Sequence, residues 1–226
     1  PFNSPWTVAG PLVVGGERTT TGTLTGLLTG QIDKVSIWNR QIEARERINA
    51  TNGVDPSSLQ MTHAISANWP LNDAAGSTFA SDQSGYGFPL TLSGAPLPNF
   101  GTPSGSTNSA NVLTLASASS QLASTASQRV DPSGPFAASL FVNLTDNTQS
   151  GTLIRVGNGS ADEWAITYRY NATVSQGNFV FGRSKTGTAG SARDEVLSPP
   201  VTPSLSGGWQ NVIAVYDPNH QWQIGR

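Results

Sequence analysis

The chain has 226 residues, no cysteine and a formal net charge of −2 at pH 7, and glycine and proline are frequent in it. Charged residues make up 12% of the chain, about half of the ~25% that soluble domains usually contain. The scattered charges argue against nucleic acid or an anionic membrane as a partner, and the lack of cysteine excludes disulfides and thiolate chemistry.

The first clear element is a strand between Gly30 and Arg40. Its apolar residues nearly alternate with polar ones, as expected for a strand with one covered face. From Gln41 to Ile48 the apolar residues switch to helical spacing, which predicts a short surface helix. We expect these two elements to close a β domain, although they lie near the start of the chain.

The next segment, residues 49–62, is polar and contains the pairs Asn-Gly, Asp-Pro and Ser-Ser. Such turn-forming pairs are typical of a linker. The main boundary of the chain is therefore predicted here.

Beyond residue 62 the chain is a series of short β-like runs bounded by turn residues, which predicts an all-β, two-sheet antiparallel sandwich. The most apolar runs, Phe136–Asn143 and Trp209–Tyr216, should lie in the middle of a sheet. Long surface loops are expected at Gly94–Gly105 and Ser198–Gly208, where glycine and proline gather. The remaining predicted strands are His63–Pro70, Leu90–Leu92, Val112–Leu115, Thr152–Val156, Glu163–Tyr170, Asn178–Phe181 and Gln221–Ile224.

Residues 30–40 read Gly-Gln-Ile-Asp-Lys-Val-Ser-Ile-Trp-Asn-Arg. This segment resembles the last strand of laminin-G-like jelly-roll domains of the concanavalin A-like lectin/glucanase superfamily, which commonly follows the pattern Gly-x-Ile-Asp-x-Val-x-Ile-Trp/Tyr-x-Arg. The other segments that resemble family elements are Trp6–Gly15 (penultimate strand), Trp69–Thr78 (opening strand and turn), Asp82–Gly87 (Asp-x-Ser-Gly-x-Gly loop) and Gly208–Asp217 (late central strand).

The resemblance implies a rotated order of segments. Residues 1–48 correspond to the end of such a domain and residues 63–226 to its front and centre, so the chain is either cut across a tandem array or cyclically permuted. Either piece alone would expose sheet edges and half a core. We therefore expect the pieces to complete one sandwich, within a chain or by strand exchange between self-associating chains.

The resemblance also implies a structural calcium ion. In relatives an aspartate at the place of Asp33 binds calcium together with backbone carbonyls, and the loop with Asp82 lies at the early-loop position. Carbonyls and one or two carboxylates can supply the oxygens that calcium needs. The alternatives are that Asp33 caps a turn or pairs with Lys34 or Arg40, and that Asp82 initiates an Asx-turn.

Glycoside hydrolysis is the enzymatic alternative, because relatives use two carboxylates for it. The Glu-x-Asp-x-x-Glu signature that places acids on one face of a strand is missing. The adjacent pairs Asp162–Glu163 and Asp194–Glu195 should point to opposite faces and are expected in loops. His63 and His220 have no triad motif around them, so we expect no enzyme.

Aromatic side chains offer a sugar-binding site instead, because sugars stack on flat rings. The predicted contacts are Trp164, Tyr168 and Tyr170, with Trp164 favoured by its acidic neighbours. Trp209 can be compared with them, but together with Trp38 and Trp69 it lies in an apolar run that predicts a core position.

The sequence thus favours a non-catalytic module that binds carbohydrate or a cell-surface protein. Low charge and many Thr, Ser and Asn residues suit an extracellular protein, with any export signal outside this segment. No apolar run approaches the ~18 residues of a membrane span, so membrane insertion is not expected. A structural spacer or assembly unit in a large tandem-repeat surface protein is the alternative.

Overall fold

Short strands separated by turns make up nearly all of the regular structure. The computed structural model describes residues 11–18, 23–52, 54, 65–102, 111–119, 121–125, 134–146, 148–157, 162–184, 193–201, 208–217 and 223–225. The elements are β1 (Leu12–Val14), β2 (Glu17–Arg18), β3 (Leu24–Thr25), β4 (Gly30–Trp38), α1 (Ala44–Thr51), β5 (Ile65–Trp69), β6 (Phe79–Ala80), β7 (Leu90–Ser93), β8 (Asn99–Gly101), β9 (Val112–Leu115), β10 (Leu122–Thr125), β11 (Phe136–Leu144), β12 (Gly151–Gly157), β13 (Asp162–Asn171), β14 (Gln176–Ser184), β15 (Arg193–Leu197), β16 (Trp209–Tyr216) and β17 (Gln223–Gly225).

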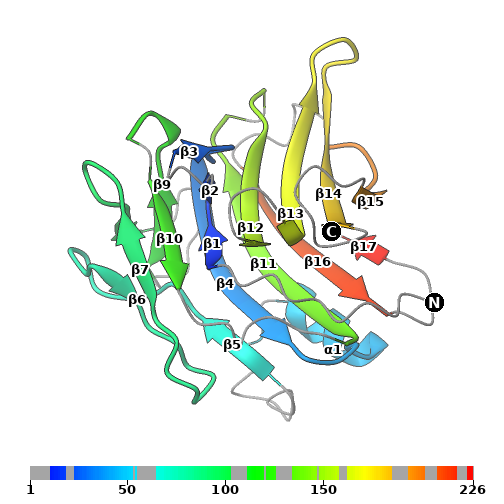
Figure 1. Cartoon of the computed structure of the whole chain (residues 1–226), viewed down its shortest axis with the longest axis horizontal. Coiled ribbons are helices and arrows are strands. Elements are labelled where there is room, and N and C mark those ends of the chain that lie inside the picture. Colours follow the sequence, from blue (N-terminus) through cyan, green and yellow to red (C-terminus); the bar gives the residue numbers. More distant parts are fainter. Residues whose placement is uncertain are drawn as a thin grey trace.

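Two antiparallel sheets pack face to face (Figure 1). In the described part of the chain, the large sheet has the order β15-β14-β13-β12-β1-β10-β7-β6. The small sheet has the order β17-β16-β11-β4-β9-β8, and β5 also pairs with β4. The predicted all-β, two-sheet sandwich with one short helix after the Asp33 strand is confirmed.

Strands from the first 48 residues lie in the interior of both sheets. In the large sheet β1 pairs with β10 on one side and with β12 on the other. In the small sheet β4 pairs with β11 along its length, with β9 through its first half and with β5 through its second half. Segments far apart in the sequence are therefore neighbours in each sheet.

The core between the sheets is formed by residues that alternate along the strands. On β4 these are Ile32, Val35 and Ile37, and on β11 every second residue from Phe136 to Leu144 is buried in the same cluster. Burying one such side chain contributes about 1.5–3 kcal/mol. The alternation seen in the sequence thus orients the strands, and it leaves the intervening residues on the outer face.

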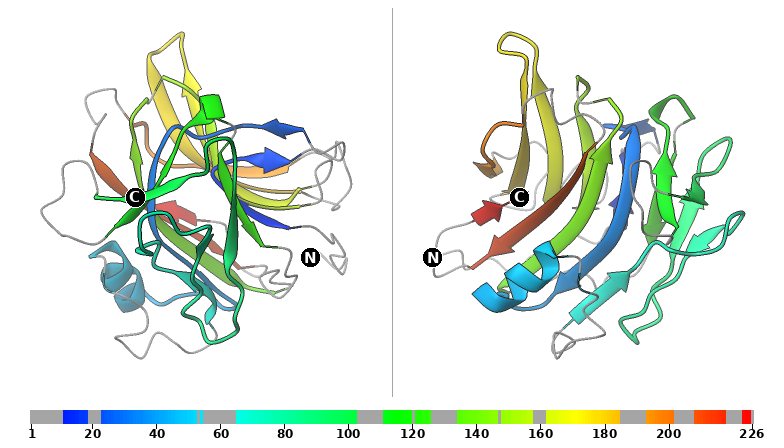
Figure 2. Two further views of the ribbon diagram at one scale, coloured as in Figure 1. Left: turned by 90° about the vertical axis from the view of Figure 1, so that its left-hand side faces the viewer. Right: turned by 180° about the vertical axis from the view of Figure 1, so that it is seen from behind.

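A second, smaller apolar cluster holds α1 on the outer face of the small sheet (Figure 2). Ile42 and Ala50 pack there against Trp38 of β4 and Ile213 of β16. The predicted helix spanned Gln41–Ile48, whereas α1 begins at Ala44 because Glu43 has an extended backbone and caps it. The helix covers only part of this outer face.

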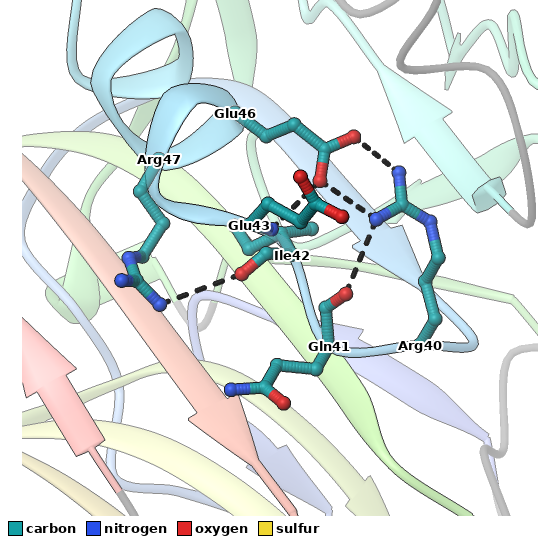
Figure 3. Close-up of polar contacts among 6 residues, drawn as sticks. All are labelled: Arg40, Gln41, Ile42, Glu43, Glu46 and Arg47. Atoms are coloured by element: carbon teal, nitrogen blue, oxygen red, sulfur yellow. Dashed lines mark hydrogen bonds and ion pairs between the residues drawn. The ribbon is translucent and has the colours of Figure 1, made fainter.

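The start of α1 is fixed by Glu46 (Figure 3). Its carboxylate accepts hydrogen bonds from the guanidinium of Arg40 and, at 2.7 Å, from the backbone N–H of Glu43, which completes a capping box. The hydrogen bond from Arg40 is the main cause that holds the pKa of Glu46 below its usual range. The carboxylate therefore stays charged and bonded under mildly acidic conditions.

Glu46→Gln is expected to lower the free energy of unfolding by about 1 kcal/mol, because it weakens both the cap and the ion pair. Because its folded pKa is depressed, this contribution is present above the unfolded pKa and is lost as pH falls through the folded pKa. Urea unfolding at pH 7 and pH 3 measures it. An equal difference between wild type and variant at both pH values would contradict the assignment.

Two predicted loops contain strands. β8 lies inside Gly94–Gly105, and β15 includes the Asp194–Glu195 pair that was expected in a loop. Both are edge strands, where interrupted patterns are tolerated. The Asp162–Glu163 pair likewise begins β13 instead of lying in a loop.

Candidate functional site

The outer face of the small sheet is apolar under α1 and becomes more polar where the helix no longer covers it. On β16, Ile213 and Val215 pack under the helix, whereas Trp209 and Asn211 share their face but lie nearer the start of the strand. The helix cluster includes no residue of β16 before Ile213. The face that begins at Asn211 is therefore polar where the helix-covered part is apolar.

Two rows of outward-facing side chains cross the sheet in this region. Strand register places Trp209 beside Asn143, and Asn143 beside Gln31. It also places Phe141 between Asn211 and Asp33. We call these residues, with the neighbouring Thr114, the polar face: Trp209, Asn143, Gln31, Thr114, Asn211, Phe141 and Asp33.

Some side chains of the polar face already form hydrogen bonds within the protein. Gln31 donates a hydrogen bond from Nε2 to Oγ1 of Thr114 at 3.1 Å. Asn211, 8% exposed, donates from Nδ2 to the backbone oxygens of Ala50 at 3.4 Å and Leu140 at 3.5 Å. Asn211 is therefore held between the end of α1 and the sheet.

Two buried polar atoms on the same strand have no hydrogen-bond partner. They are Nε1 of Trp209, a donor, and Oδ1 of Asn211, an acceptor. Each such atom costs about 1–3 kcal/mol when it is desolvated without a partner. Buried polar groups in native proteins are nearly always bonded, so an exception calls for a water molecule, an ion or a ligand.

Asp33 is brought to the polar face by a bulge in β4. Lys34 has a left-handed backbone, with φ of 50°, and the register with β11 shifts beside it. Val35 consequently returns to the core while Asp33 faces outward. Desolvation raises the pKa of Asp33 to about 6, although the charge and the backbone N–H of Lys34 act in the opposite direction.

Asp82 holds the loop that joins β6 to β7. Its Oδ1 accepts from the backbone N–H of Asn68 at 3.1 Å and of Ser84 at 2.9 Å. Its Oδ2 accepts from Oγ of Ser84 at 2.7 Å and from the N–H of Phe88 at 2.9 Å. Four protein donors fill the acceptor capacity of this carboxylate, and the bond to Ser84 N–H forms an Asx-turn.

Calcium binding by Asp33 and Asp82 stays a prediction, and strand register separates the two aspartates along the sheet. Asp82 is bonded to Asn68, which lies beside Ser36 on β4. Asp33 is three residues from Ser36, which corresponds to about 10 Å along a regular strand. To bind one calcium ion, an oxygen of each carboxylate must lie within about 2.6 Å of the ion. In the described residues, no group of three or more acidic or histidine side chains forms a metal site.

The aromatic residues predicted to bind a ligand lie elsewhere. Trp164 and Tyr168 are 0% and 1% exposed and face the core between the sheets. The ring of Trp164 packs on Phe136 with centroids 5.0 Å apart. Neither ring therefore has a face open to a sugar. Tyr170 is partly buried and packs against the edge of the same core.

Of the two acidic pairs, the structure describes the side chains of Asp194 and Glu195. Glu195 accepts two hydrogen bonds from the guanidinium of Arg169, the shorter at 2.8 Å, as a surface ion pair across β13 and β15. Asp194 is its neighbour on the strand and points to the opposite face. His63 and His220 lie outside the described residues.

Sequence reasoning gave Trp209 a core position because it lies in an apolar run. The side chain is instead only partly buried, on the outer face. The alternation along the strand could have predicted this position. The core-facing residues of β16 are Val212, Ala214 and Tyr216, so the odd-numbered residues Trp209 and Asn211 must face outward.

No protein family, curated protein or solved structure matches this chain. Within the described residues no helix is long and apolar enough to cross a membrane.

Proposed function

We propose that this chain is a non-catalytic, extracellular carbohydrate-binding module and that the polar face of the small sheet is its binding site. The observation that carries the proposal is the unpartnered donor of Trp209 and acceptor of Asn211, two residues apart on one strand. A sugar hydroxyl both donates and accepts hydrogen bonds, so neighbouring hydroxyls can satisfy both atoms.

The surroundings suit a sugar as well. The partly exposed ring of Trp209 offers a stacking surface, whereas Nζ of Lys34 lies over the ring of Phe141, 5.6 Å from its centroid. Amides and a hydroxyl fill most of the remaining positions. The amides of Gln31, Asn143 and Asn211 are buried, at 7%, 0% and 8% exposed, whereas Thr114 is partly exposed. Because Nε1 of Trp209 and Oδ1 of Asn211 are both buried, binding requires both side chains to turn toward the ligand. The resemblance of Gly30–Arg40 to laminin-G-like domains supports the same class of function.

Trp209→Ala is expected to weaken glycan binding at least tenfold, because it removes a stacking surface and a hydrogen-bond donor together. Binding of the purified chain to an array of immobilised oligosaccharides measures the effect. Val174→Ala is the matched control, since Val174 is an exposed apolar side chain in the turn between β13 and β14. Equal binding by wild type and Trp209→Ala would place the site elsewhere.

An assembly module is the second candidate, and one observation favours it. Phe79, Tyr86 and Leu97 are exposed large hydrophobic residues from one short segment around β7, at the edge of the large sheet. Exposed apolar patches often mark interfaces. Sedimentation velocity over a range of protein concentrations separates the candidates: concentration-dependent dimers without glycan binding would select assembly.

A further inference from the structure

The loop between β6 and β7 presents an exposed aromatic ring at its tip. Tyr86 is 54% exposed and lies between Gly85 and Gly87, whose φ angles are 89° and 75°. These left-handed conformations favour glycine. The ring of Tyr86 is stacked on that of Phe88, with centroids 6.2 Å apart and planes inclined by 11°. Phe88, which packs against the core, thus holds its ring parallel to that of Tyr86 and offset from it.

This loop is fastened at both ends. Asp82 accepts four hydrogen bonds, as described above, and the N–H of Gln83 donates to the backbone oxygen of Asn68 at 2.7 Å. After the tip, the buried indole of Trp69 donates from Nε1 to the backbone oxygen of Phe88 at 2.7 Å. The Tyr86 ring is therefore presented on a braced loop, which reduces the entropy lost when a ligand binds.

The charges in this segment favour a neutral ligand. Between Ser81 and Pro89, Asp82 is the one residue charged at neutral pH, and its oxygens are already occupied by protein donors. The exposed ring of Tyr86 and the exposed amide of Gln83 remain accessible to a ligand. This combination suits the apolar face and hydroxyls of an uncharged sugar ring.

We propose that Tyr86, whose ring lies parallel to that of Phe88, is a second carbohydrate contact that stacks on one ring of a neutral polysaccharide. This inference rests on the proposed function for its ligand class. The loop is hydrogen-bonded to β5, which pairs with β4 of the polar face. The loop itself joins two strands of the large sheet, so these hydrogen bonds link it to the small sheet. A long glycan that reaches both contacts gains affinity through effective concentration.

Affinity electrophoresis in gels that contain soluble xyloglucan, mixed-linkage β-glucan, galactomannan or pullulan tests the proposal, with alginate as the anionic comparison. Tyr86→Ala is expected to weaken binding to a neutral polysaccharide about threefold to tenfold. Binding of short oligosaccharides at the polar face should be unchanged. Phe79→Ala is the matched control, because this exposed ring lies on the neighbouring strand β6. The melting temperature of each variant verifies the fold.

The outcomes separate the two proposals. Lost binding in Trp209→Ala with unchanged binding in Tyr86→Ala overturns this inference alone. Lost binding in Tyr86→Ala with unchanged binding in Trp209→Ala supports the aromatic platform and overturns the polar face as the site. Retardation by alginate alone, or a loss of self-association in Tyr86→Ala, overturns the neutral glycan as the occupant.

Discussion

Asp82→Ala is expected to lower the free energy of unfolding by about 3 kcal/mol, because it removes the acceptor of four hydrogen bonds. Three of the donors are backbone N–H groups, of Asn68, Ser84 and Phe88, and they are part-buried. For a chain of this length the loss corresponds to a fall of roughly 6–12 °C in melting temperature. Differential scanning calorimetry measures it.

Asp82→Asn is the graded control. The amide keeps one oxygen for two donors and replaces the other acceptor with a donor group, so we expect about half of the loss. Glycan binding gives a second measurement: a loosened loop should weaken polysaccharide binding through Tyr86 even below the melting transition. A melting temperature of Asp82→Ala within 1 °C of wild type would show that the loop does not depend on this carboxylate.

The strands of this fold could be predicted where one face is apolar and the other polar. Gly30–Trp38 shows this, because its alternation follows from one covered face. The edge strand β8 was missed, since Pro98 and Gly101 within and beside it suggest a loop by composition. Its pairing with β9 is a long-range contact that local propensity does not encode.

The candidate site was harder to predict than the fold because it depends on what covers each outer face. Trp209 and Ile213 share one face of β16, yet α1 covers Ile213 and leaves Trp209 partly exposed. Trp164 was expected to face a ligand because acidic residues precede it. Trp164 lies on the same face of β13 as Ile166 and Tyr168, and this face is apolar. The small sheet packs against this face and buries all three side chains.

Asp33→Asn is expected to stabilise the fold at pH 7 in the presence of a chelator. Desolvation raises the pKa of Asp33 from 3.8 to about 6 in the folded chain, so the unfolded chain loses this proton first as pH rises. Ionisation therefore favours unfolding, and stability should fall between about pH 4 and pH 6 and then level off. The upper limit of this loss is about 3 kcal/mol.

Chemical unfolding of wild type and Asp33→Asn from pH 4 to pH 8 in EDTA measures the difference. The asparagine variant should lack this fall and exceed wild type above pH 6, because its neutral amide has no charge to desolvate. Repeating the series with millimolar calcium tests the cation that the laminin-G resemblance implies. A calcium-dependent stabilisation of wild type that Asp33→Asn abolishes would support Asp33 as a calcium ligand, and an unchanged stability in calcium would count against it. Such a stabilisation would also mean that backbone carbonyls supply the remaining ligands, since Asp82 is committed to its loop.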